Sequence, residues 1–189
     1  WFAIQELQRD FDVRAVETDA AEIDTAITTL VVVHPRDLGE KTLFAIDQFV
    51  MRGGRLIACV DPFSMADMES GARGPMAMYG GGRYSSTLGP LFDAWGIGFD
   101  TGKLVADLRA VTPLGNGAGG VEESPVFLWL KRENMNSSDL LTAQLDQIML
   151  PFAGAFTDAT GDDVAFEPLI SSSDAACMVD AMTAQFGAQ

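Results

Sequence analysis

Basic side chains are scarce in this sequence. Its 189 residues include 12 Lys and Arg against 27 Asp and Glu, which gives a formal net charge of −15. Nucleic-acid binding needs Lys and Arg to neutralise phosphates and release counterions, and anionic membrane surfaces attract the same residues. The charge therefore argues against a nucleic-acid partner and against direct adsorption to an anionic membrane.

Long apolar runs are missing as well. The longest candidate, residues 27–33, has the length of a strand and falls far short of the ~18–20 apolar residues that span a bilayer. The chain starts at Trp1, and no basic segment followed by an apolar stretch marks a signal peptide. We expect a single soluble α/β domain over 1–189, truncated at its N-terminus, whose membrane attachment lies in parts of a parent protein outside this chain.

Cysteine is nearly absent, and the two that occur make neither a disulfide framework nor a zinc site. Cys59 lies within an apolar strand pattern, which predicts a buried, inert thiol. A single bridge to Cys177 stays open. We expect no metal site and no cofactor.

The residues that are plentiful indicate a globular core, since 48% of the chain is apolar. Residues 29–33 form a continuous β-branched run typical of a strand buried on both faces, residues 39–52 have helical spacing that ends at Gly53-Gly54, and residues 55–60 repeat the strand pattern. Strand, helix and strand with short connections predict a right-handed βαβ unit. We therefore expect a mostly parallel, Rossmann-like or flavodoxin-like sheet.

The remainder of the chain is less regular. Residues 63–85 are rich in methionine and glycine without a period, which predicts a long mobile loop. Further elements are expected from apolar patterns and capping residues: a helix from Ser85-Ser86 to Trp95, strands over 103–107 and 125–130, a helix over 138–147, and strand-like segments over 148–156 and 164–170. The last two are joined through Thr160-Gly161-Asp162, which predicts a C-terminal antiparallel hairpin.

Two polar residues follow the predicted strands of the βαβ unit. His34 and Asp61 each stand where a strand ends, and ligands of open α/β sheets bind outside the carboxyl ends of the strands. Adding a nearby serine would complete a hydrolytic triad, but the sequence has no Gly-x-Ser-x-Gly elbow, so we assign no catalytic residue. The candidate binding cleft comprises His34, Asp61, Pro62, Ser64, Arg83 and Ser85.

The order of motifs resembles a known family. The most specific segment is Ala45-Ile-Asp-Gln-Phe-Val-Met-Arg-Gly-Gly54, between Leu30-Val-Val-Val-His-Pro35 and Val60-Asp-Pro62. Val105-Ala-Asp107 and Glu167-Pro-Leu-Ile-Ser-Ser-Ser173 agree later in the chain. Together these segments resemble the soluble domain of gliding-motility-type ABC transporter auxiliary proteins (GldG-like).

This resemblance implies a fold related to class I glutamine amidotransferase-like domains and a membrane-anchored parent whose domain faces the extracytoplasmic (periplasmic) side. It also implies ABC permease and ATP-binding subunits as partners. Enzymatic relatives of that fold use a cysteine at a strand-to-helix elbow, whereas Cys59 here lies inside a strand. We therefore expect a non-enzymatic domain that binds a ligand or an envelope partner. The alternatives are a hydrolase or amidotransferase-like enzyme with a cleft near His34 and Asp61, and a purely structural scaffold.

Overall fold

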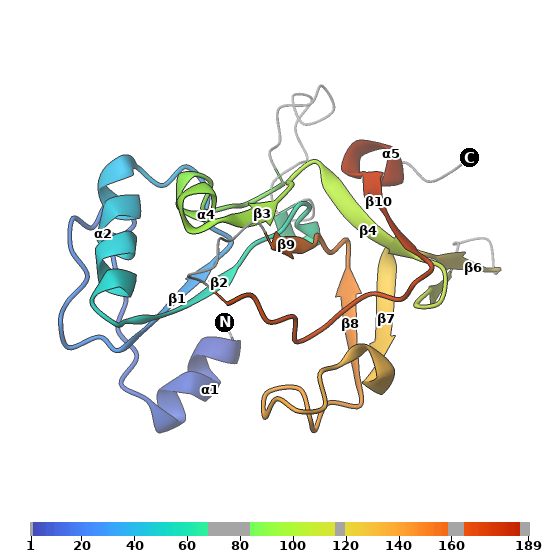
Figure 1. Cartoon of the computed structure of the whole chain (residues 1–189), viewed down its shortest axis with the longest axis horizontal. Helices are drawn as coiled ribbons and strands as arrows, with labels where there is room; N and C mark the ends of the chain where they lie inside the picture. Colours follow the sequence, from blue (N-terminus) through green and yellow to red (C-terminus); the bar gives the residue numbers. More distant parts are fainter. Residues whose placement is uncertain (1, 68–83, 116–119, 159–164, 186–189) are drawn as a thin grey trace. The chain divides into compact units, whose positions relative to one another are not determined.

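The computed structural model describes residues 2–67, 84–115, 120–158 and 165–185 (Figure 1). Its first elements are α1 (Phe2–Asp10), β1 (Thr29–Val33), α2 (Glu40–Met51), β2 (Arg55–Cys59), α4 (Pro90–Trp95) and β3 (Ile97–Phe99). They are followed by β4 (Lys103–Asp107), β5 (Thr112–Gly115), β6 (Val121–Ser124), β7 (Phe127–Lys131), the 3₁₀ turn η2 (Arg132–Asn134), β8 (Gln147–Pro151), β9 (Phe156–Asp158), β10 (Ala176–Asp180) and α5 (Ala181–Gln185).

Contacts divide the chain into two compact units. Unit 1 comprises Trp1–Val32 and Asp37–Ala58, and unit 2 comprises Val33–Arg36 and Cys59–Gln189.

Helix α2 organises unit 1. It begins after Gly39 and buries the side chains of Thr42, Ala45, Ile46 and Phe49, which recur at helical spacing on one face. The helix predicted from the spacing is confirmed, and so is its end, because Gly53 adopts a φ of +93° that residues with a Cβ rarely reach. Strands β1 and β2 flank the helix in the sequence and pair with each other.

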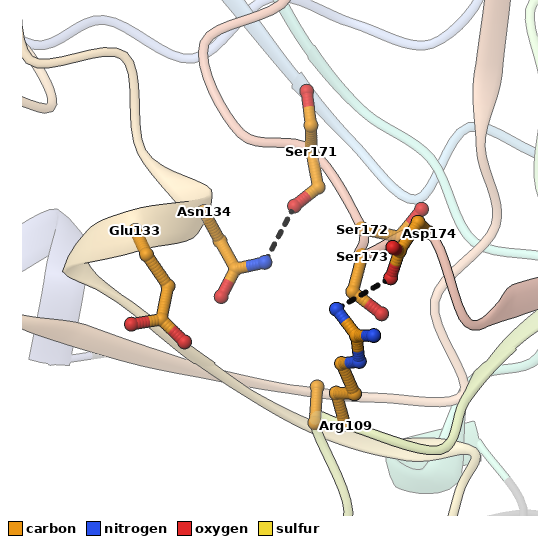
Figure 2. A pocket seen from close by; sticks show the side chains of 8 residues that line it. Arg109, Glu133, Asn134, Ser171, Ser172, Ser173 and Asp174 are labelled. Atoms are coloured by element: carbon orange, nitrogen blue, oxygen red, sulfur yellow. Dashed lines mark hydrogen bonds and ion pairs between the residues drawn. The ribbon is translucent and has the colours of Figure 1, made fainter.

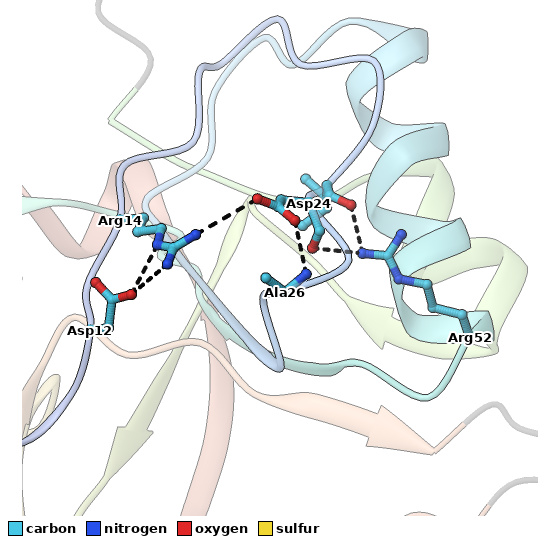
Figure 3. A network of polar contacts seen from close by, with 6 residues as sticks. Asp12, Arg14, Asp24, Ala26 and Arg52 are labelled. Carbon is cyan, nitrogen blue, oxygen red and sulfur yellow. Dashed lines mark hydrogen bonds and ion pairs between the residues drawn. The ribbon is translucent and has the colours of Figure 1, made fainter.

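Polar contacts hold the irregular segment before β1 to the end of α2 (Figure 3). The Arg52 guanidinium donates to the carbonyl oxygens of Ile23 at 2.6 Å and Asp24 at 3.0 Å, and it lies 5.3 Å from the centre of the Phe49 ring. Arg14 pairs with Asp12 at 2.6 Å and with Asp24 at 3.8 Å. Both arginines thus contact Asp24, Arg52 through its backbone carbonyl and Arg14 through its carboxylate.

Antiparallel pairs make up unit 2. Strand β4 pairs with β10, β7 with β8, β5 with β6, and β3 with β9, all with antiparallel register. One buried cluster, Val105, Ala110, Leu128 and Leu130, packs where β4 and β7 approach. A second cluster, Phe63, Leu104 and Ala181, is extended by Phe152, whose ring centre lies 5.0 Å from that of Phe63.

The predicted sheet is wrong. The described residues contain only two-stranded sheets, four of them antiparallel, rather than a mostly parallel Rossmann-like, flavodoxin-like or glutamine amidotransferase-like sheet. Parallel neighbours need a crossover of a dozen or more residues, usually a helix. After β2, the connections 108–111 and 125–126 are too short for a crossover, so these strands reverse or turn away instead.

The C-terminal hairpin is also not formed as expected. Strand β8 pairs with β7, which precedes it, and Ile170 makes only an isolated bridge to Met135. Residues 159–164, which include the expected turn, lie outside the described residues. The predicted loop over 63–85 falls mostly on residues 68–83, which are also outside them.

Burial of the first strands differs from the prediction too. Val31, Val33 and Ile57 are between 42% and 51% exposed, so β1 and β2 bury one face rather than two. Both cysteines are free and exposed, which overturns the buried position expected for Cys59 and the open alternative of a bridge.

Candidate functional site

The two strand-end residues singled out in the sequence do meet. Nδ1 of His34 lies 2.9 Å from Oδ2 of Asp61, and Nε2 lies 2.9 Å from Oδ2 of Asp67. Arg36 reaches the same Asp67 oxygen at 2.8 Å. Directly after β1, the chain turns at His34 with a φ of +50°, and this turn leaves the imidazole only 15% exposed.

This arrangement ties two segments together and does not resemble a catalytic base. A neutral imidazole carries one N–H and donates to one carboxylate, whereas the imidazolium donates to both. A general base must instead accept a hydroxyl proton at a free ring nitrogen. Since both ring nitrogens of His34 face carboxylates, the geometry opposes the hydrolytic triad.

The other predicted residues are distributed differently. The Ser64 hydroxyl accepts from the backbone N–H of Asp67 at 3.3 Å. Ser86, rather than a neighbouring serine, joins Asp61: its hydroxyl accepts from the Asp61 N–H at 2.9 Å, and its own N–H donates to the Asp61 carbonyl at 2.7 Å. Ser86 is only 2% exposed, which makes this pair part of the folded framework.

Pro62 and Ser85 line a separate cavity of about 220 Å³ together with Phe63, Tyr84, Thr101, Gly102, Asp180 and Ala181. Arg83 lies outside the described residues. The five described residues of the predicted cleft are therefore divided: His34 and Asp61 meet in the histidine cluster, Ser64 supports it, and Pro62 and Ser85 line another cavity.

A second polar site was missed by the sequence analysis. A cavity of about 340 Å³, here called the serine pocket, is lined by Arg109, Ala110, Glu133, Asn134 and the four residues Ser171, Ser172, Ser173 and Asp174 (Figure 2). Arg109 follows β4, Glu133 and Asn134 belong to η2, and the serines precede β10. Three elements far apart in the sequence thus converge within unit 2.

Buried Asp107 forms the foundation of the serine pocket. It is 0% exposed, and its carboxylate accepts from the Ser173 hydroxyl at 2.6 Å, from the Ser173 N–H at 2.7 Å and from the Arg109 N–H at 2.9 Å. Burial alone would raise the pKa of Asp107, but these bonds and one from the Ala110 N–H outweigh it and hold the pKa below its ordinary value of 3.8. The carboxylate thus stays ionised and fixes the pocket wall.

Asn134 fixes the opposite wall. Its side-chain amide donates to the Ser171 carbonyl at 3.0 Å, and its backbone carbonyl accepts from the Ser171 N–H at 2.9 Å. Its amide oxygen accepts from the Lys131 N–H at 3.0 Å. Arg109 and Asp174, which also line the pocket, form an ion pair at 2.6 Å, and both side chains are exposed.

One signal in the sequence indicated this pocket. Asp107 ends an apolar strand in the same way as Asp61 does, so the rule that singled out Asp61 applies to it equally. The two motifs that meet here, Val105-Ala-Asp107 and Glu167-Pro-Leu-Ile-Ser-Ser-Ser173, lie 60 or more residues apart, and their pairing required the fold.

The described part of the chain has neither a metal-ligand cluster nor a membrane-spanning helix. It contains no group of three or more His, Cys, Asp or Glu side chains placed to share a metal ion. Every helix in it is too short or too polar to cross a bilayer.

Comparison with known proteins gives one match. A family model described as an ABC-type uncharacterized transport system matches residues 1–189. No curated protein and no solved structure matches the chain.

Proposed function

Because the chain belongs to the family described as an ABC-type uncharacterized transport system, we propose that it acts in such a system by binding, without catalysis. Members of this family are auxiliary components of the transport system. The proposed partners are the ABC permease and ATP-binding subunits, and the proposed location is the extracytoplasmic side of the membrane. The bound species is a ligand or another envelope component.

The observation that carries this proposal is the serine pocket. Binding sites for small molecules are concave and largely pre-formed, and a few polar groups in them fix the orientation of the ligand. Here the walls are held by the buried Asp107 carboxylate and by Asn134, while Ser171 and Ser172 also line the cavity, and their hydroxyls make no hydrogen bond to another described residue. A rigid frame with unengaged polar groups is suited to recognition.

The histidine cluster supports the non-enzymatic part of the proposal. His34 is the only histidine in the chain, and carboxylates occupy both of its ring nitrogens. The Asp61–His34–Asp67 contacts then stabilise the fold, because each of them joins residues far apart in the sequence.

A purely structural scaffold remains the second candidate, favoured by exposed apolar side chains in unit 1. Val31 is 44% and Ile57 51% exposed on β1 and β2, and helix α1 buries none of its residues. Strands β1 and β2 pair with each other, so these side chains belong to one two-stranded sheet, and contiguous exposed apolar surface is typical of contact with another protein. The two functions differ in whether the serine pocket is needed.

Co-purification tests membership of the transport complex. The full-length protein that carries this chain, extracted from its native membranes in a mild detergent, should retain the permease and the ATP-binding subunit. An unrelated anchored envelope protein, purified in the same way, is the control. Recovery of neither subunit would contradict the proposed partners.

A further inference from the structure

The serine pocket also indicates what kind of molecule it takes. We infer that it binds a small saccharide without acidic groups, with amino sugars preferred, and this inference rests on the binding function proposed above. Three properties of the lining lead to this ligand class: its hydrogen-bonding groups, its charge and its small number of apolar side chains.

The hydrogen-bonding groups of the lining match those of a sugar. Hydroxyls donate and accept, the Glu133 carboxylate only accepts, and the Arg109 guanidinium only donates. Among the described residues, no hydrogen bond or ion pair engages the Glu133 carboxylate or the hydroxyls of Ser171 and Ser172. A ring of adjacent hydroxyls, each both donor and acceptor, can satisfy all of these groups at once.

The charge of the lining disfavours anions. Arg109 supplies one positive charge, and it already pairs with Asp174 at 2.6 Å. Glu133 adds a second negative charge to the lining, and the buried Asp107 carboxylate lies directly behind Ser173. Because the whole chain carries −15, a phosphate or an acidic sugar would be repelled both locally and at long range. An amino group would instead be attracted to Glu133.

The shape and apolar content disfavour a protein segment as the occupant. Protein anchors need apolar or aromatic pockets, yet the only apolar lining residue is Ala110, which is 4% exposed. The volume of about 340 Å³ lies at the lower end of the range of about 300–1,000 Å³ for small-molecule pockets. One or two sugar rings suit this size better than a polymer or a folded partner.

Amide chemical shifts of the complete 189-residue chain test the inference. Glucosamine, N-acetylglucosamine, glucuronic acid and inorganic phosphate are titrated separately, at a pH of about 6 so that the amine is protonated. We expect glucosamine and N-acetylglucosamine to shift the amides of Arg109, Asn134 and Ser171–Asp174 with dissociation constants on the order of 1 mM, since no aromatic platform contributes. Glucuronic acid and phosphate should leave these amides unchanged.

Two variants make the test specific. Glu133→Gln should weaken glucosamine about threefold to fivefold, as expected for an exposed charge pair, while leaving N-acetylglucosamine nearly unchanged. Glu123→Gln is the matched control, because it removes the same charge from an exposed residue of β6 outside the pocket.

Two results would overturn the inference: no shift of the pocket amides with either neutral or amino sugar at about 20 mM, or equal binding of phosphate. Neither result bears on co-purification with the transporter subunits. Failure of the saccharide inference is thus distinguishable from failure of the proposed function.

Discussion

At the scale of the residue, the buried carboxylate of Asp107 accepts the hydrogen bonds that hold one wall of the serine pocket in place. Its two carboxylate oxygens accept two hydrogen bonds from Ser173 and one each from the N–H groups of Arg109 and Ala110. In Asp107→Asn, an NH₂ group replaces one carboxylate oxygen. Because NH₂ is a donor, it cannot accept the hydrogen bond that this oxygen accepted, and the N–H or O–H group opposite it loses its acceptor. Leaving a buried donor unpaired costs about 2–3 kcal/mol, so the free energy of unfolding measured in urea should fall by that amount.

Asp174→Asn provides the matched comparison for Asp107→Asn, because its carboxylate is 74% exposed and pairs only at the surface. This variant should lose no more than about 1 kcal/mol. Equal losses in the two variants would show that the buried bonds do not stabilise the chain.

The pH dependence of the same variant has a definite sign. Since the pKa of Asp107 is lowered by its hydrogen bonds, the folded chain holds this proton less tightly than the unfolded chain does. The stabilisation is therefore complete above the unfolded pKa of about 3.9 and is lost as pH falls through the lower folded value. The difference in unfolding free energy between the wild-type chain and Asp107→Asn should be constant from about pH 7 to 5 and shrink below about pH 4. A difference that grows on acidification would contradict this account.

At the scale of the element, the end of helix α2 depends on close packing. Phe49 is 0% exposed, and a Cβ added at Gly54 would meet its ring at distances that real atoms do not adopt. Gly54→Ala should therefore lower the free energy of unfolding by about 1–3 kcal/mol. Gly115→Ala is the control, because its added Cβ meets nothing within 4 Å. Chemical denaturation of both variants checks the prediction, which a stable Gly54→Ala would refute.

The same element shows what the sequence could predict about the fold. Helix α2, the glycines that end it and strands β1, β2, β4 and β7 follow from local patterns, because apolar spacing and glycine conformation act over a few residues. Strand partners do not follow from such patterns. Residues 103–107 read equally well as a central parallel strand, yet β4 pairs with β10, which begins 69 residues after the end of β4. A local sequence pattern thus predicts that a strand forms, whereas the strand with which it pairs depends on tertiary packing.

Some contacts of the candidate sites could likewise be predicted from local patterns, and others could not. His34 and Asp61 could be placed together because each ends a strand and the two strands pair. The contact of Asp67 with His34 could not be predicted, because no local sequence pattern relates Asp67 to a histidine 33 residues earlier. The serine pocket could not be predicted for a similar reason: it is formed by a strand end, a 3₁₀ turn and a run of serines from three separate regions of the chain.

At the scale of the whole molecule, the charge of −15 is unevenly distributed. Positions 133–189 hold nine acidic residues and no basic one, and all of them belong to unit 2. The field of such a surface favours cationic and neutral ligands over anions. This agrees with the lining of the serine pocket, in which Arg109 is the one basic side chain.

The central claim is that a transport-system component works through the serine pocket, and complementation tests it most directly. Ser172→Phe in the full-length protein would fill the pocket without touching the bonds of Asp107, because Ser172 is exposed and lies beside Ser173. Ser137→Phe, at an exposed serine outside the pocket, is the matched control. Both variants should still co-purify with the transporter subunits, but in a strain that lacks the gene only Ser137→Phe should restore the wild-type phenotype. Full restoration by Ser172→Phe would contradict the account and favour the scaffold.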